Sequence, residues 1–428
     1  MHPPDGRQPA PQGTTRTVPA RCPGARMAPL GGPLRSRNFR LLAACNVISV
    51  AGSQAAAVAI PFAVLRSGGS ASDVGYVATA ELIAMTGCLL LGGAVADRLP
   101  RHHVIMAAEF LQALAQGSSG ALVLTGHARV WQLAALAAAG GAGFGFYYPA
   151  AQGLLPQTVP ASQRAQANAL FRTGRNAASI GGAALGGLIT GLAGPGWALA
   201  ADAVSFTAAA ALRVGMRFQR LPPAQAPGML GDLRDGWREF TAHRWLWPIV
   251  AQFTVITGIY AAAMSVLGPL VAHASLGGAR SWGLITAAYA AGAVAGGLVM
   301  TRYRPRRPLV AAMLSVPAYS LLLFALAVPL PVPPDLAAAL VAGGSLEVFT
   351  VCWATTMQQE IPPEKLSRVA SYDALGGIAL TPAATAIAGP LAAAIGTAGV
   401  LAGGGALVAI LPALTVLIPE VRHMRREH

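Results

Sequence analysis

The segment Gly93-Ala-Val-Ala-Asp97-Arg98-Leu-Pro-Arg101-His102 forms a short charged elbow between two long apolar stretches, residues 75–96 and 104–124. An apolar stretch of about 20 residues is long enough to cross a bilayer as a helix. The elbow therefore predicts a tight turn at a membrane surface, with Asp97 at the C-terminal end of the first helix.

The composition extends this interpretation to the whole chain. Apolar residues make up 54% of the sequence and charged residues 11%, against about 45–50% and 25% in soluble proteins. The charges cluster, which leaves repeated apolar runs of spanning length. The sequence predicts an all-α membrane protein with twelve transmembrane helices, at residues 41–65, 75–96, 104–125, 130–149, 170–193, 197–216, 246–271, 282–301, 309–330, 335–357, 374–395 and 398–418.

The net charge of +14 reflects topology rather than nucleic-acid binding. If the N-terminus is cytoplasmic, all Lys and Arg residues except Arg66, Arg129 and Arg280 fall in cytoplasmic segments. This asymmetry follows the positive-inside rule and predicts both termini in the cytoplasm, with the protein in the plasma membrane. The basic segments are also expected to contact anionic lipid headgroups of the bilayer.

The N-terminal segment differs in composition from the rest. Residues 1–40 are basic and residues 1–33 rich in Pro, Gly and Arg, so we expect a disordered cytoplasmic tail without a cleavable signal peptide. Translation from Met27 is an alternative to translation from Met1. The four cysteines, 22, 45, 88 and 352, predict buried or tail thiols rather than a disulfide framework.

A polar segment, residues 218–245, divides the spans into halves at residues 41–217 and 246–419, followed by a short tail at 420–428. The halves repeat each other. Gly93-x-x-x-Asp97-Arg98 has a counterpart in Gly297-x-x-x-Thr301-Arg302, and Val159-Pro160 has one in Ile361-Pro362. Two landmarks in the same order predict two pseudo-symmetric six-helix halves with a solute site between them.

The elbow resembles the signature loop of major facilitator superfamily transporters, on the residues Gly93, Asp97, Arg98 and Arg101. The resemblance implies a twelve-helix transporter in which these residues form a conformational latch. In that family the acid meets the start of the eleventh helix, here near residues 371–373. Asp373 would repel Asp97 there and Arg368 would attract it, and lipid phosphate binding by the arginines is the alternative.

The fifth predicted span contains two small-xxx-small pairs, Gly182/Gly186 and Gly187/Gly191, which predict close helix packing. The pattern also resembles the glycine–proline motif of drug/proton antiporters, although Ala183 replaces the proline. Residues 155–160, 167–176 and 202–206 resemble the efflux branch of the superfamily that includes enterobactin-type exporters and macrolide efflux proteins. This resemblance implies export and names no solute.

Ionisable residues inside spans are costly and are functional candidates by default. Glu347, Glu81, Glu109 and Asp202 lie within predicted spans, and a carboxyl group there can carry a proton. The alternative for each is an acid paired with a neighbour for packing. The fourth span lacks the arginine found in better-known drug antiporters, which weakens the case for proton coupling.

Aromatic residues predict the lining of a greasy cavity, with packing or lipid-facing roles as the alternative for each. The candidates are Phe146, Tyr147, Tyr260, Tyr289 and Trp353, with Asn46, Gln54, Gln112 and Gln252 for polar contacts. As a set they favour a hydrophobic or amphipathic small molecule.

Other functional classes lack their motifs. Lys365, the only lysine, has no preceding glycine loop for ATP, and the eight histidines show no zinc spacing, so neither an ATP-driven pump nor an enzyme is expected. We predict a monomeric secondary transporter that needs no cofactor and exports its solute in exchange for protons, with the proton gradient as energy source. An importer, or a non-transporting membrane sensor on the same fold, is the alternative.

Overall fold

The computed structural model describes residues 32–216 and 245–423, apart from 100, 153, 304 and 329, together with Arg238 and Thr241. Every regular element within these ranges is a helix. The predicted linker and the terminal tails lie largely outside the described residues.

The N-terminal half alternates long helices with tight turns. Its helices are α1 (Arg37–Arg66), α2 (Ala71–Arg98), α3 (Arg101–Leu124), α4 (Val130–Gln152), the short α5 (Leu155–Thr158), α6 (Arg164–Leu192) and α7 (Pro195–Val214). The C-terminal half contains α9 (Leu246–Ala262), η3 (Ala263–Leu267), α10 (Gly268–Ser275), α11 (Ala279–Arg302), α12 (Pro308–Ser315), η4 (Val316–Tyr319), α13 (Ser320–Ala327), α14 (Val332–Glu360), α15 (Pro363–Ile378), α16 (Thr381–Ile395), α17 (Thr397–Val416) and the short α18 (Pro419–His423).

Eight helical stretches in the described residues are long and apolar enough to span a membrane. Two of them, Arg37–Arg66 and Pro195–Val214, lie in the N-terminal half, and the other six lie in the C-terminal half. Helices α2, α3, α4 and α6 are of similar length and pack beside them. The count of twelve spans therefore stays a prediction, while the all-helical membrane architecture is confirmed.

Proline and glycine produce the local irregularities. Helix α9 passes through the π-helical η3 into α10, where Pro269 lacks a backbone N–H to donate. The expected span 309–330 is interrupted by the 3-10 turn η4, which contains Pro317. Helices α16 and α17 are joined by Gly396 alone, whose φ of +84° suits glycine.

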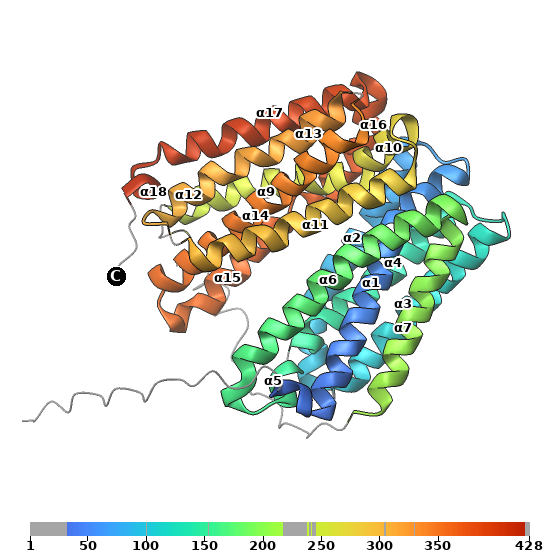
Figure 1. Cartoon of the computed structure of the whole chain (residues 1–428), viewed down its shortest axis with the longest axis horizontal. Coiled ribbons are helices and arrows are strands. Elements are labelled where there is room, and N and C mark those ends of the chain that lie inside the picture. The colour runs from blue at the N-terminus through green and yellow to red at the C-terminus, as the bar shows by residue number, and fades with distance from the viewer. Residues whose placement is uncertain are drawn as a thin grey trace, which may run out of the picture.

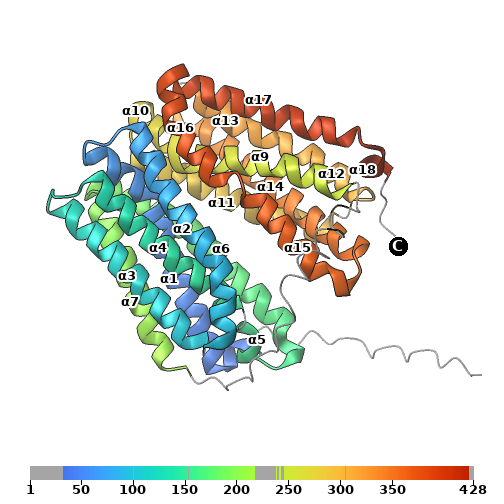
Figure 2. The same ribbon diagram turned by 180° about the vertical axis from the view of Figure 1, so that it is seen from behind.

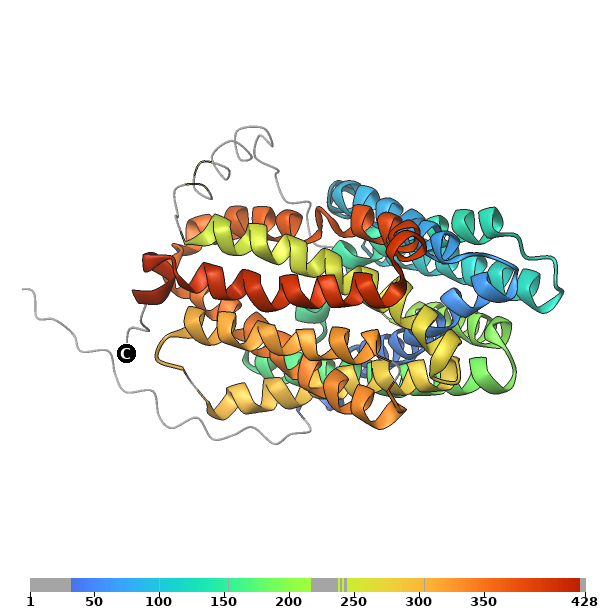
Figure 3. The same ribbon diagram turned by 90° about the horizontal axis from the view of Figure 1, so that it is seen from above.

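The helices define two sides of the bundle. We call the side where α1 begins at Arg37 and α17 ends at Val416 the terminus side, and the other the loop side. The N-terminal half, blue to green, and the C-terminal half, yellow to red, meet near the loop side and diverge toward the terminus side (Figures 1 and 2). Seen from above, the two halves overlap around the middle of the molecule (Figure 3).

Two helix pairs join the halves on the loop side. Helix α2 packs against α16, where the hydroxyl oxygens of Thr79 and Thr385 are 2.9 Å apart. Helix α6 of the N-terminal half packs against α11 of the C-terminal half, also on the loop side. A Cβ added at Gly187 would lie 2.6 Å from the carbonyl oxygen of Ala279 and 2.8 Å from Cα of Gly283. Only glycines allow the backbones to come this close.

The glycines of α6 divide between two partners. Gly182 and Gly186 contact the backbone of α1 at Ala51 and Ala55, within the N-terminal half. Gly187 and Gly191 face α11 of the other half, at Gly283 and Arg280. One helix thus anchors its own half with one glycine pair and contacts the opposite half with the other.

We predict that Gly187→Val separates α6 from α11 and opens the loop side, because the neighbouring atoms belong to backbone and cannot rotate away. A cysteine introduced at Thr286 of α11 should then react several-fold faster with an impermeant maleimide added from the loop side. Gly181→Val is the matched control, since a Cβ at Gly181 meets nothing within 4 Å. Equal labelling in both variants would show that this contact does not close the loop side.

Candidate functional site

A cavity of about 660 Å³ lies among the helices of the N-terminal half, within the range of roughly 300–1,000 Å³ typical of small-molecule sites. Its wall is formed by α1, α2, α3, α4, α6 and α7, with Leu155 of α5. Amide and hydroxyl side chains are frequent in this wall, namely those of Asn46, Ser49, Ser53, Gln54, Gln112, Gln116, Ser119, Asn168, Asn176 and Ser179. We call this space the N-half cavity.

A second cavity, of about 490 Å³, lies between the two halves. Its wall combines α1, α2 and α6 with α9, η3, α11 and α14. Gln54, Glu81, Arg175, Asn176 and Ser179 line both cavities, so the two spaces are neighbours. We call this second space the central cavity.

The central cavity brings together two of the predicted acids. Glu81 comes from α2 in one half and Glu347 from α14 in the other. Arg175 of α6 lines the same space and is exposed. A proton or cation taken up by either acid would change the charge between the halves.

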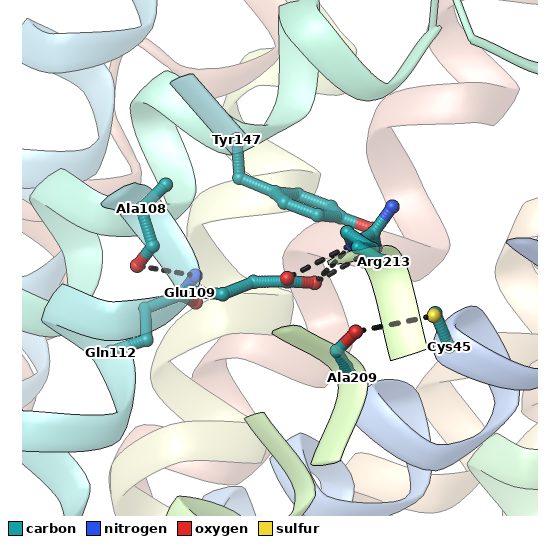
Figure 4. Close-up of polar contacts among 7 residues, drawn as sticks. All are labelled: Cys45, Ala108, Glu109, Gln112, Tyr147, Ala209 and Arg213. Carbon is teal, nitrogen blue, oxygen red and sulfur yellow. Dashed lines mark hydrogen bonds and ion pairs between the residues drawn. The ribbon is translucent and has the colours of Figure 1, made fainter. Parts of the chain in front are cut away.

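Glu109 has a different environment (Figure 4). It is fully buried in α3 and forms an ion pair with Arg213 of α7, whose Nη2 lies 2.8 Å from Oε1. The Nε of Arg213 donates to both carboxylate oxygens at 2.9 Å, and Nη2 donates to the hydroxyl of Tyr147 at 3.4 Å. This geometry holds Glu109 as a paired carboxylate, the packing alternative considered for it.

The positive-inside count places Arg213, at the end of the predicted span 197–216, among the basic residues of a cytoplasmic segment. In the structure it is a buried charge, 5% exposed in the last turn of α7. The sequence contains the information needed to predict the pairing of Glu109 with Arg213. Glu109 lies early in α3 and Arg213 late in α7, so antiparallel packing of the two helices places both charges at the same depth on the terminus side.

Asp202 is fully buried in α7 and lines neither cavity. Its Oδ1 accepts a hydrogen bond from the Ser205 hydroxyl at 3.1 Å, while Oδ2 has no partner among the described residues. Close packing surrounds it, because a Cβ added at Gly52 of α1 would meet Oδ1 at 2.6 Å.

The predicted aromatic residues fall into three environments. Tyr147 lines the N-half cavity, and Tyr260 and Tyr289 line the central cavity with ring centroids 5.6 Å apart. Phe146 and Trp353 line neither of these cavities. Phe146 packs against a core cluster on the terminus side of the N-terminal half, and the indole N–H of Trp353 donates to Asp373 at 3.1 Å.

The elbow lies where the sequence predicts a turn, because α2 ends at Arg98 and α3 begins at Arg101. The side chains of Gly93, Asp97, Arg98 and Arg101 lie outside the described part of the structure. The Trp353 contact gives Asp373 a hydrogen-bond partner within the C-terminal half, and the expected meeting of Asp97 with residues 371–373 stays a prediction.

Comparison with known proteins places this architecture in a family. The sequence model of the Major Facilitator Superfamily matches residues 42–377, which is more than half of the chain. The chain belongs to the major facilitator superfamily. It is therefore a multi-pass membrane transporter rather than an enzyme.

Within the superfamily, the chain is 26% identical over 394 residues to the multidrug efflux pump Tap of Mycolicibacterium fortuitum, covering 87% of this chain and 94% of that protein. Its fold is similar to the crystal structure of the nucleoside transporter NupG, with a TM-score of 0.70, 11% identity and coverage of 90% and 99% of the two chains. A POT family transporter in complex with 5-aminolevulinic acid matches with a TM-score of 0.71, 8% identity and coverage of 90% and 97%.

The buried ion pair supplies a stability prediction. Removing one partner leaves an uncompensated buried charge, so Arg213→Gln should lower the free energy of unfolding by about 3 kcal/mol. The double variant Glu109→Gln/Arg213→Gln should recover much of this loss, because neither charge remains. Unfolding of the purified protein in mixed micelles measures both, with exposed Arg172→Gln as control. A double variant less stable than Arg213→Gln alone would contradict this account of the pair.

Proposed function

We propose that this chain exports an amphipathic small molecule by alternating access, in exchange for protons. The observation that carries the proposal is that Glu81 and Glu347, from opposite halves, line one cavity between those halves. Protonation of these acids in one state and release in the other would couple proton flow to movement of the halves.

The direction of transport is supported by charge placement and by the efflux relative. The halves meet on the loop side and diverge on the terminus side, and the positive-inside rule assigns the terminus side to the cytoplasm. A cavity that opens there takes up solute from inside the cell. The 26% identical relative is a multidrug efflux pump, which favours export over import.

In this proposal the elbow at Asp97, Arg98 and Arg101 acts on the terminus side, where the halves must approach each other when the loop side opens. The protein works as a monomer, since one chain supplies both halves of the central cavity.

Inverted membrane vesicles test the function directly, with a panel of hydrophobic drugs and siderophore-like compounds. We expect accumulation that requires the pH gradient and stops when a protonophore dissipates it. Vesicles lacking the protein are the control. Flux only in the inward cellular direction would replace export by import, and no flux in either direction would favour a non-transporting receptor.

We expect Glu347→Gln to abolish gradient-driven flux while solute binding remains measurable, because glutamine keeps the shape but cannot exchange a proton. Glu360→Gln is the matched control, as Glu360 lies exposed at the end of the same helix. Gradient-driven flux at the control rate in Glu347→Gln would exclude this residue as the proton carrier.

A further inference from the structure

The N-half cavity has a polar wall built on helical periodicity. Asn46, Ser49 and Ser53 follow one another at spacings of three and four on α1, and Gln112, Gln116 and Ser119 do the same on α3. Residues three and four apart lie on one face of a helix, so each helix presents a continuous polar stripe to the cavity. We call these two stripes the amide–hydroxyl stripes.

Such stripes are costly in a transmembrane bundle unless something hydrogen-bonds to them. Asn46 shows the cost most clearly. It is 7% exposed, lines the cavity, and its Nδ2 has no hydrogen-bond partner among the described residues. A buried amide donor without a partner lowers the stability of the fold, so Asn46 is the wall side chain that gains most by turning its amide toward a bound molecule.

The charges of the wall indicate what kind of molecule this is. Among the described residues, the wall contains one acid, Glu81, and one base, Arg175. Their formal charges cancel. The other buried charges of this half, Glu109, Arg213 and Asp202, are not part of the lining. With Glu81 ionised, the cavity therefore has no net charge that would favour a cation or an anion.

The remaining wall is apolar. Phe144, Tyr147, Phe171 and Phe206 contribute aromatic rings beside the amide–hydroxyl stripes. Amides and hydroxyls both donate and accept hydrogen bonds, which matches a solute group with several hydroxyls on a compact ring. Aromatic rings bury the apolar faces of such a group.

We propose that the N-half cavity binds an uncharged, hydroxyl-rich group of the transported solute, such as a sugar ring attached to an apolar scaffold. This inference rests on the proposed export function in taking the bound molecule to be a transported solute. The binding site itself is defined by the residues of the cavity wall. The apolar remainder of the solute extends past Gln54 and Ser179, which line both spaces, toward Tyr260 and Tyr289 of the central cavity.

The test is a binding measurement on the full chain in lipid nanodiscs. Calorimetric titration compares 4-nitrophenyl β-glucoside with 4-nitrophenyl sulfate and 4-nitrobenzyltrimethylammonium, which share the aromatic part and differ in the polar group. We expect saturable binding of the glucoside and at least about tenfold weaker binding of the two ions. Equal or tighter binding of either ion, or no saturable binding of the glucoside, overturns the proposal.

Asn46→Leu separates a binding role from a structural one. Removing a buried donor that has no partner should raise the melting temperature of the unliganded protein, while weakening glucoside binding about tenfold or more. Gln132→Leu, at the start of α4 and outside both cavities, is the control and should bind normally. A lower melting temperature or unchanged binding in Asn46→Leu contradicts the assignment.

The binding result is independent of transport. If glucoside binding fails while vesicles still show gradient-driven export, the proposed site is wrong and the proposed function stands. If binding succeeds and no transport occurs, the site stands and the chain is a receptor for such molecules.

Discussion

The close approach of α6 and α11 through Gly187 and Gly283 is the contact on which the rest of this arrangement depends. Together with the α2–α16 contact at Thr79 and Thr385, it joins the halves on the loop side and leaves them apart on the terminus side. At Gly187 and Gly283 the contact is between backbones, and at Thr79 and Thr385 it is between two small hydroxyl side chains. Joints of this kind can close and open at small cost, as a transporter with two accessible states requires.

The buried charges divide into fixed and available groups. Glu109 and Arg213 neutralise each other within one half and hold α3 to α7 beside Tyr147. Glu81 and Glu347 face a cavity shared by both halves, where a change in charge acts on the relation between them. The N-half cavity adds neutral polar groups on the same path. The proposed coupled transport of an amphipathic molecule depends on the acids between the halves and on the polar wall within one half.

Much of the fold follows from short-range features of the sequence. The elbow at Asp97 and the apolar runs on either side predict an all-helical bundle, and the glycines of the fifth span predict close packing without naming its partners. The site is harder to predict because it depends on long-range register. Arg213 lies at the end of a predicted span, where a basic residue is expected at the cytoplasmic surface, and only packing of α7 on α3 buries it. The sequence alone does not single out Gln116 and Ser119, because the exposed Ser118 beside them obscures the spacing of three and four that defines the stripe.

The central claim is that the two halves exchange which side of the bundle is closed. Pulsed electron paramagnetic resonance between spin labels tests it most directly, with one pair at Arg172 and Arg302 on the terminus side and another at Leu192 and Ser275 on the loop side. All four positions are exposed, and native cysteines are replaced. As pH is lowered, the account predicts that the terminus-side distance shortens while the loop-side distance lengthens. Distances that stay constant, or that change in the same direction, would contradict it.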